Sequence, residues 1–387
     1  MRYQRIAILI ITLALFTAAS PAANGQVGGT FVPTGDMRTA RWQHTATLLT
    51  DGRVLIAGGE GGLSSTELYD PASGTFQSAG GMSARRRLHT ATLLPDGKVL
   101  IAGGWGESSA ELYDPATGRF VRTGDMLEDQ AGHTAVLLRN GKVLTSGGMR
   151  AARPWPTAAR AELYDPLTGT FVFAGTHATN GSLYPGSGGP VWPVANVLPD
   201  GRVLITGDNP PEIYDPIGDT FDLTGALTHS SYRYGMYWHR GTSLTDGKVL
   251  ITGGIDDWAC SGFVNAEIYD PSSSSFIALG NMTEPRELHT STLLRDGSVL
   301  LTGGGSGGCY SETLSSAELY DPSSGTFVSA GSMTRKRISH TATLLNDGTV
   351  LIAGGAAYHP YTTTQSAELF RPAAPRAPEP RSRGIRR

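Results

Sequence analysis

Histidine and glutamate recur at fixed positions of a repeated segment, so they are the first residues of this chain to test for chemistry. One position lies eight residues before the glycine of a turn such as Asp51-Gly52. In the fourth unit it is Pro193, and in the other six it is a histidine: His44, His89, His133, His239, His289 and His340. Seven glutamates share a second position: Glu67, Glu111, Glu162, Glu212, Glu267, Glu318 and Glu368.

A ring of imidazoles could hold a metal ion. A residue that nearly every repeat carries is explained more simply by a contact that every repeat makes, such as a hydrogen bond to backbone where two units meet. We therefore assign both sets to structure, name no catalytic residue among them, and expect no metal ion and no cofactor.

A single catalytic or binding site requires residues that depart from the repeat. Two of the loops that connect the units are unusually long. The distance from the phenylalanine that ends one unit to the histidine position of the next is 13 residues at five junctions. It is 22 residues at the junction before Pro193 and 18 residues at the junction before His239. The fourth unit also has Gly207-Asp208 where the other units have two glycines. Two long loops beside a short one predict a recess on one face of the molecule.

The long loops and the next variable loop carry aromatic and polar residues suited to sugars, because apolar sugar faces stack on rings and hydroxyl groups need donors and acceptors. Asp208, Asp256 and Asp257 are the non-repeated acids near the recess, and Arg233 could anchor an acidic sugar. The alternative is that the rings plug the channel mouth or pack the loops. The candidate ligand-binding residues are Tyr184, Trp192, Asp208, Asn209, Tyr232, Arg233, Tyr234, Tyr237, Trp238, Asp256, Asp257 and Trp258.

The elements that must position these residues follow from the repeat itself. In the first unit, HTATLL at 44–49 and VLIAGG at 54–59 flank Asp51-Gly52, a predicted two-residue type I′ hairpin turn. ELYDP at 67–71 and GTF at 74–76 form a third and a fourth strand. The second strand is apolar on both faces, so neighbouring sheets must cover it. Seven such units of four strands predict an all-β, seven-bladed β-propeller.

A count of the phenylalanines that end each unit predicts how the ring closes. Phe31 precedes the first complete unit, whereas the last unit, ending AELFRP at 367–372, lacks one. We therefore expect residues 29–35 to be the outer strand of the last blade, which removes an open edge.

The double glycines, as at Gly58-Gly59, together with the Glu-Leu/Ile-Tyr of the third strand, resemble kelch repeats. HTATLLPDGKVLIAGG at 89–104 looks most like the propeller domain of the galactose and glyoxal oxidases. The resemblance covers nearly all of the chain after its N-terminal segment and implies a kelch-type propeller. This fold hosts enzymes, adhesins and scaffolds alike.

The resemblance also implies what an oxidase would need: a tyrosine cross-linked to cysteine, a second tyrosine, and two histidine ligands, with a Tyr-His pair beginning a first strand. No tyrosine precedes a repeated histidine here, and Trp238-His239 is the nearest match. Tyr358-His359 lies in a loop after a second strand. We therefore expect no copper-radical site. The residues before the six histidines are Gln43, Leu88, Gly132, Trp238, Leu288 and Ser339.

The N-terminus has the layout of a secretory signal peptide, with Arg2 and Arg5 before an apolar run and small residues after it. We expect residues 1–25 to be this signal peptide, residues 26–372 the propeller, and the Pro/Arg-rich residues 373–387 a disordered tail. The protein would then be secreted or periplasmic, without stable membrane insertion. In that setting Cys260 and Cys309 are expected to form a disulfide.

A net charge of −3 gives no electrostatic basis for binding nucleic acid. The main expectation is a monomeric, non-catalytic binding module for a glycan or protein ligand. The alternative is a carbohydrate-active enzyme on the same propeller, and a third possibility is a scaffold that uses the edge of the disc.

Overall fold

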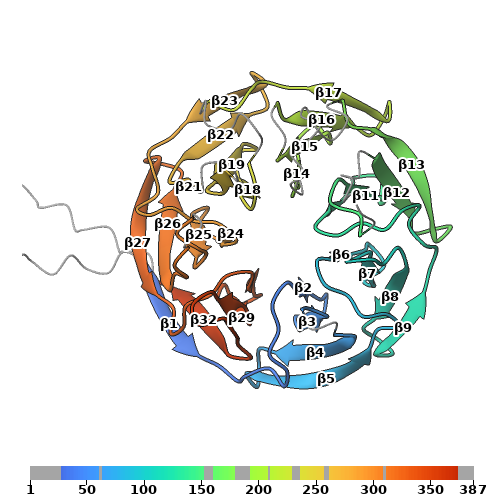
Figure 1. Cartoon of the computed structure of the whole chain (residues 1–387), viewed down its shortest axis with the longest axis horizontal. Helices are drawn as coiled ribbons and strands as arrows, with labels where there is room; N and C mark the ends of the chain where they lie inside the picture. The colour runs from blue at the N-terminus through green and yellow to red at the C-terminus, as the bar shows by residue number, and fades with distance from the viewer. Residues whose placement is uncertain are drawn as a thin grey trace, which may run out of the picture.

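The computed structural model describes residues 28–60, 63–151, 160–178, 192–207, 210–228, 236–256, 261–307 and 311–373. Seven four-stranded antiparallel sheets stand around a central axis like the blades of a propeller (Figure 1). Nowhere in these ranges does a helix have the length and apolarity needed to span a membrane. The all-β, seven-bladed architecture expected from the repeats is confirmed.

Each blade runs from an inner strand at the axis to an outer strand at the circumference. The inner strands are β2 (Thr45–Leu48), β6 (Thr90–Leu93), β10 (Thr134–Leu137), β14 (Val194–Val197), β18 (Arg240–Ser243), β24 (Thr290–Leu293) and β28 (Thr341–Leu344). The second strands are β3 (Val54–Ala57), β7 (Val99–Ala102), β11 (Val143–Ser146), β15 (Val203–Thr206), β19 (Val249–Thr252), β25 (Val299–Thr302) and β29 (Val350–Ala353).

The remaining two strands of each blade complete the sheets. The third strands are β4 (Ser65–Asp70), β8 (Ala110–Asp114), β12 (Arg160–Asp165), β16 (Glu212–Asp215), β22 (Ala266–Asp270), β26 (Ser316–Asp321) and β32 (Ala367–Pro372). The outer strands are β5 (Thr75–Gly81), β9 (Arg119–Arg122), β13 (Thr170–Thr176), β17 (Thr220–Leu223), β23 (Ser275–Ala278), β27 (Thr326–Ser332) and β1 (Gly29–Pro33).

The Asp-Gly turns differ from the expected two-residue type I′ turn. The N–H of Gly52 donates to the carbonyl of Leu49, and the N–H of Leu49 donates to the carbonyl of Arg53. Gly52 has a φ of 87°, while Asp51 is not among the residues with positive φ. The loop is therefore a three-residue type I turn closed by a left-handed glycine. Asp51 favours this form because its carboxylate accepts the N–H of Arg53 at 3.0 Å.

The hydrophobic core lies at the junctions between blades. All four residues of each second strand are buried, as in β3. Val54 and Ile56 of β3 pack in one cluster with Leu351 and Ala353 of β29, which belongs to the neighbouring blade. Burying one such side chain stabilises the fold by about 1.5–3 kcal/mol. Every blade therefore depends on both of its neighbours.

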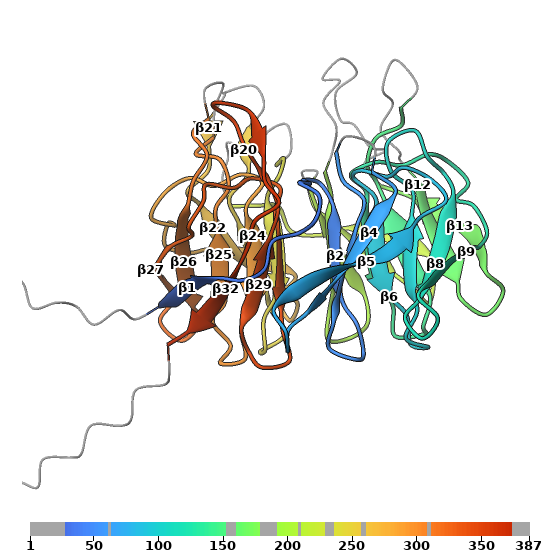
Figure 2. The same cartoon turned by 90° about the horizontal axis from the view of Figure 1, so that it is seen from below.

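The ring closes as the phenylalanine count predicted. Strand β1 pairs antiparallel with β32, and Gly29 lies opposite Pro372. The rings of Phe31 and Phe370 lie 5.0 Å apart. Figure 2 shows these two strands side by side. The first described strand thus completes the last blade.

Two short hairpins stand on one face of the disc, and Figure 2 shows the first of them above the blades. They are β20 (Ile255–Asp256) with β21 (Ser261–Gly262), and β30 (Ala356–Ala357) with β31 (Thr362–Thr363). Isolated bridges connect each hairpin to a segment that enters an inner strand, Tyr237 with Ile255 and Ile338 with Ala356. These hairpins therefore lie beside the mouth of the central channel.

Candidate functional site

The residue before each repeated histidine adopts the left-handed backbone conformation. We call these six the rim residues, and their φ values lie between 48° and 65°: Gln43, Leu88, Gly132, Trp238, Leu288 and Ser339. For a residue with a side chain this conformation costs about 1–2 kcal/mol. A compensating contact must therefore occur in each of these blades.

That contact is a set of backbone hydrogen bonds between adjacent rim residues. The N–H of Leu88 donates to the carbonyl of Gln43 at 3.3 Å, and the N–H of Gly132 donates to that of Leu88 at 2.8 Å. In the later blades the N–H of Leu288 donates to the carbonyl of Trp238, and the N–H of Ser339 donates to that of Leu288. In the described part of the chain it is interrupted only at the fourth blade. The left-handed turn therefore ties each blade to the next around the channel mouth.

The repeated histidines form a second set of contacts between blades. The Nε2 atom of His89 lies 3.1 Å from the hydroxyl of Thr45, and that of His239 lies 2.7 Å from the hydroxyl of Thr206. Burial, the largest cause, lowers the pKa of both histidines to about 3. Imidazoles in such sites are neutral at physiological pH. The contact between blades expected for them is present, with a threonine hydroxyl of the neighbouring blade as its partner, and His239 also contacts the backbone carbonyl of Met236 through Nδ1.

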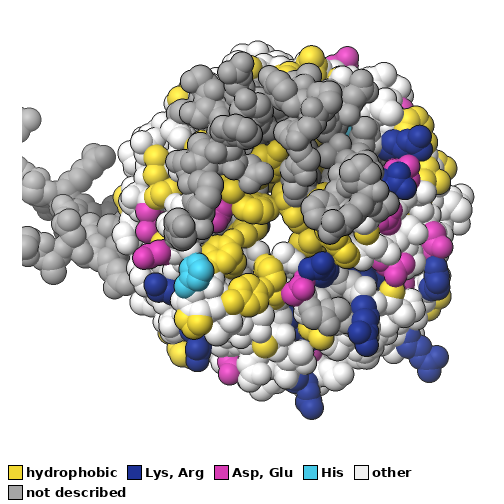
Figure 3. All heavy atoms as spheres, viewed as in Figure 1, with side chains coloured by type: hydrophobic (Ala, Val, Ile, Leu, Met, Phe, Trp, Pro, Cys, Tyr) yellow, Lys and Arg dark blue, Asp and Glu magenta, His cyan; other side chains and the backbone are white. Residues whose placement is uncertain are grey.

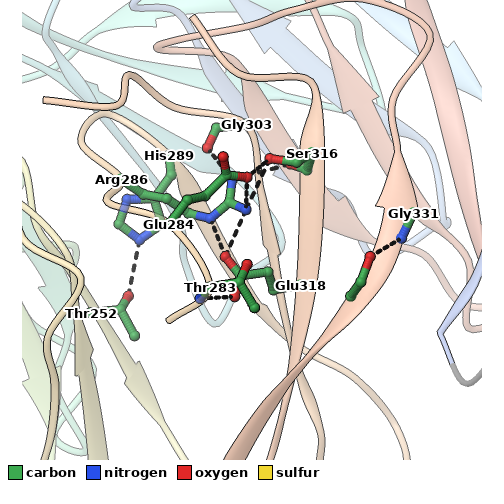
Figure 4. A network of polar contacts seen from close by, with 10 residues as sticks. Thr252, Thr283, Glu284, Arg286, His289, Gly303, Ser316, Glu318 and Gly331 are labelled. Carbon is green, nitrogen blue, oxygen red and sulfur yellow. Dashed lines mark hydrogen bonds and ion pairs between the residues drawn. The ribbon is translucent and has the colours of Figure 1, made fainter. Parts of the chain in front are cut away.

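The repeated glutamates bind a buried arginine in four blades. In the sixth blade, Arg286 pairs with Glu318 at 2.7 Å and donates to the carbonyl of Gly303 at 2.9 Å, while Glu318 also accepts the N–H of Thr283 (Figure 4). These charges are compensated where they lie, so they fasten the segment that enters each blade to the third strand of that blade and are not available to a ligand. The other three pairs are Arg41–Glu67, Arg86–Glu111 and Arg337–Glu368.

A cavity of about 380 Å³ lies where the inner strands converge, and the rim residues are part of its wall. Figure 3 shows hydrophobic side chains gathered around the central opening of this face. Trp42, Trp192 and Trp238 line the cavity together with Arg240 and Tyr358. Its size is that of a small-molecule site.

Arg240 is a cation in the cavity wall without a matching carboxylate among the described residues. Its Nε donates to the carbonyl of His289 at 2.7 Å and its Nη1 to the carbonyl of His239 at 3.0 Å. Among the described residues it forms no ion pair, unlike the four buried arginines above. Burial lowers its pKa to about 10, so the guanidinium keeps its charge at neutral pH.

Glu287 is buried beside Tyr358, which is half-buried and lines the cavity. Glu287 is 2% exposed, and its Oε2 has no hydrogen-bond partner within the described ranges. Burial raises its pKa, while hydrogen bonds from Ser311 and Tyr358 act in the opposite direction. Burial and the nearby Glu287 raise the pKa of Tyr358. Perturbed groups of this kind that reach a cavity are candidates for proton transfer.

The structure brings only part of the sequence-derived site together. Trp192 and Trp238 line the cavity, whereas Tyr237 is buried and is absent from its wall. Asp256 is placed by its backbone in β20. The other candidates, Tyr184, Asp208, Asn209, Tyr232, Arg233, Tyr234, Asp257 and Trp258, and the cysteines Cys260 and Cys309, lie outside the described residues.

Sequence reasoning missed Arg240 and Glu287, although both depart from the repeat. The position of Arg240 is threonine in five units and Val194 in the other. No other unit has an acid where the sixth has Glu287. Comparing the units position by position, and not loop by loop, would have found both residues.

No protein-family model and no curated protein matches the chain. Among solved structures it is similar to that of a novel fungal alcohol oxidase with catalytic diversity among the AA5 family, in complex with copper. The TM-score is 0.75 and the sequence identity is 19%, and the match covers 89% of this chain and 76% of the oxidase. At this identity the likeness concerns the fold.

The expectation of a non-catalytic binding module is wrong. The solved structure described above, which shares this fold, is that of an enzyme. The expectation treated the repeated histidines and glutamates as structural and looked for acids only in the variable loops, whereas the inner strand β18 places Arg240 in the wall of the cavity that Tyr358 also lines. The alternative of an enzyme on the same propeller agrees better with the comparison.

The described residues do not fit the copper of that oxidase. They contain no group of three or more His, Cys, Asp or Glu side chains that could hold a metal ion. His44 and His89 both line the cavity, but each lies with its Nε2 on a threonine hydroxyl. The mechanism proposed below therefore uses only side chains of this protein.

Repeat and structure now agree on the architecture. The double glycines, the blade-to-blade histidines and the likeness to the alcohol oxidase all describe one fold. The chain is a seven-bladed kelch-type β-propeller with the fold of the copper alcohol oxidases.

Proposed function

We propose that the protein is an enzyme that acts on a carbohydrate in the axial cavity. The observation that carries the proposal is the Glu287–Tyr358 pair, because it combines a buried carboxyl group with a phenol that reaches the cavity wall. The likeness to an alcohol oxidase supports a substrate that bears hydroxyl groups. The cavity has the size for one or two sugar rings.

The pair is suited to hold and transfer one proton. Burial raises the pKa of each group and so favours its neutral form, and the phenol keeps its proton at rest. Tyr358 would give its proton to a substrate oxygen, and Glu287 would return a proton to the phenol oxygen. In the reverse direction the same two transfers would remove a proton from a substrate hydroxyl.

The surroundings of Glu287 keep it in position for this role. Its backbone exchanges two hydrogen bonds with Gly305, at 2.9 Å and 2.8 Å. A Cβ on Gly305 would lie 2.7 Å from Oε1 of Glu287, so glycine makes the space for the carboxyl group. The N–H of Tyr358 donates to the hydroxyl of Thr313 at 2.8 Å, which fixes the start of the tyrosine loop.

The indole rings at the cavity would bind the sugar. Trp192 and Trp238 come from adjacent blades and both line the cavity. Aromatic rings in such a position stack on the apolar face of a pyranose. The sugar would then present its oxygens to Tyr358.

We also propose that residues 1–25 direct export, so that the propeller of residues 26–372 works in the periplasm or outside the cell as a monomer. Residues 373–387 would remain a solvated tail. A disulfide between Cys260 and Cys309 belongs to this proposal. Titration of the oxidised, denatured protein should then find no free thiol, and two titratable thiols would contradict it.

The test is a survey of turnover. Purified protein is incubated with neutral and acidic mono- and oligosaccharides, in air, with and without added copper. Products are followed by mass spectrometry, by hydrogen peroxide and by ultraviolet absorbance of a new C=C bond. The active substrate is then tested with Tyr358→Phe and Glu287→Gln, which should each lower kcat by about 10²–10⁴-fold.

Tyr361→Phe is the control, because this tyrosine lies in the same loop and is 55% exposed. Its kcat should equal that of the wild type. Failure to convert any substrate of the survey, or full activity in Tyr358→Phe, would overturn the proposal.

A further inference from the structure

We propose that Arg240 binds the carboxylate of an acidic sugar in the axial cavity, so that the substrate is a uronic acid or an oligosaccharide that contains one. This inference rests on the proposed function and names its substrate class. It starts from a charge without a counterpart: in the described chain Arg240 has no ion-pair partner, although it lines the cavity.

The comparison with the other arginines of the disc shows that this is unusual. Arg41, Arg86, Arg286 and Arg337 are buried, and each pairs with a glutamate of its own blade. Arg240 differs from them in being only partly buried, at the cavity wall. Removing a cation even partly from water without an anion is unfavourable, so proteins place a counter-charge or a ligand beside it. Arg240 lacks the first of these among the described residues.

The described histidines nearest to Arg240 do not neutralise it. The histidines around it, His239, His289 and His340, have pKa values lowered first by burial and further by positive charge, including that of Arg240. They are neutral and contribute no negative charge. Burial lowers the pKa of Arg240. Arg240 is therefore the charged side chain in the described part of the cavity wall.

The guanidinium is held in one orientation. Nε donates to the carbonyl of His289 and Nη1 to that of His239, both of them fixed backbone groups. In the described part of the chain Nη2 has no hydrogen bond, and it is not among the fully enclosed atoms that lack a partner. Its N–H groups and the second N–H of Nη1 are available to a carboxylate, whose two oxygens match the planar guanidinium.

The aromatic residues lie in the same sector of the disc. Trp238 is two residues before Arg240, and Trp192 enters the adjacent blade. A uronic acid whose pyranose ring stacks on one of these indoles would present its carboxylate to the part of the cavity wall that contains Arg240. Both residues follow the two long loops, so the departures from the repeat converge on this side of the cavity.

The experiment measures binding by calorimetry to the full-length wild-type protein at low and at raised salt. The probes are galacturonate, its uncharged methyl ester, and galactose. Galacturonate should bind at least tenfold more tightly than the ester or galactose, and the difference should shrink with salt. Galactose 6-sulfate is a fourth probe, and tighter binding of the sulfate than of galacturonate would overturn the choice of a carboxylate.

Arg240→Gln should remove the preference for galacturonate while galactose still binds, and Arg240→Lys should restore only part of it. Arg87→Gln is the matched control, because Arg87 is a partly exposed arginine that pairs with Glu60 and stacks on Trp105. It should leave the preference unchanged. Thermal melting confirms that each variant is folded.

The outcomes separate this inference from the proposed function. Equal binding of galacturonate and its ester, with turnover of a neutral sugar, would overturn the role of Arg240 alone. Tight, Arg240-dependent binding of galacturonate without turnover would support the role of Arg240 and overturn the enzyme. Absence of binding by all four probes would overturn the inference.

Discussion

The ring of Trp192 occupies the space in which a side chain at position 132 would lie. A Cβ added to Gly132 would come within 1.9 Å of the Cζ3 atom of Trp192. Gly132 is the rim residue without a side chain, and its φ of 65° suits glycine. The third blade therefore leaves its rim position open, and the tryptophan that enters the fourth blade fills it.

This relationship predicts a strong effect of Gly132→Ala. The added methyl group must displace the indole, and overpacking of this kind costs about 1–3 kcal/mol. Trp192→Ala should relieve the clash, so the double variant should be more stable than the sum of the single effects indicates. Urea unfolding of the three variants measures this coupling. Additive effects would show that the two residues do not interact.

The buried histidines predict a loss of stability in mild acid. Their pKa in the unfolded chain is near 6.5, whereas in the fold that of His89 is lowered to about 3. Unfolding therefore takes up protons below pH 6.5. Stability is complete above that pH and falls as the pH decreases toward the folded pKa, by about 1.4 kcal/mol per pH unit for each such histidine.

Urea unfolding between about pH 7 and pH 5 checks this dependence. His89→Gln should reduce the slope by about one proton while it lowers stability at pH 7. An unchanged slope in this variant would contradict the assignment of His89 as a neutral buried group.

Glutamates at the same repeated position should respond to substitution in opposite ways. In the third blade Gln130 stands where four other blades have arginine, and burial raises the pKa of Glu162. The contribution of Glu162 to stability is complete below its ordinary pKa of 4.5 and is lost as the pH rises through the raised value. Glu162→Gln should therefore gain stability relative to the wild type between about pH 4 and pH 7.

Glu318→Gln provides the contrast, because it leaves Arg286 buried without its anion. This change should cost about 3–5 kcal/mol at neutral pH. Chemical denaturation of both variants across this pH range measures their free energies of unfolding. Changes of the same sign at pH 7 would contradict the predicted opposite effects of the two substitutions.

Closure of the ring predicts that the N-terminal strand stabilises the whole disc. Deletion of residues 26–36 removes β1 and uncovers the edge of β32. Because each blade shares its core with its neighbours, the melting temperature of the entire protein should fall. Deletion of residues 376–387 is the control and should leave melting unchanged. A truncated protein that melts like the full-length chain would exclude the role of β1.

Stacking predicts a selective effect of Trp238→Ala. It should weaken binding of the sugar identified in the survey by on the order of 1 kcal/mol and raise KM with it. Trp105→Ala serves as the comparison, because Trp105 stacks on Arg87 and is not part of the cavity wall. Equal KM values for the two variants would place the substrate elsewhere.

The sequence was sufficient to predict the repeat, the number of blades and the closing strand, because each depends on patterns that recur seven times. It mispredicted the Asp51-Gly52 turn, since an Asp-Gly pair is compatible with both a two-residue and a three-residue loop. Backbone hydrogen bonds with Arg53 decide between them in the fold.

The site was less predictable, because it depends on residues that are distant in the sequence. Glu287 and Tyr358 come from the sixth and seventh blades, and only the packing of one blade on the next brings them together. Arg240 could have been found from its position in the repeat. Its lack of an ion pair among the described residues could not, since that depends on every neighbouring blade.

The pairing of β1 with β32 has a mechanical consequence. The two strands are antiparallel with Gly29 opposite Pro372, so the start of one lies beside the end of the other. A force that pulls the N-terminal and C-terminal ends of the chain apart would break the hydrogen bonds between β1 and β32 one after another, and not all at once. A ring that resists heat by sharing its core should therefore open at a low force when it is stretched from its ends.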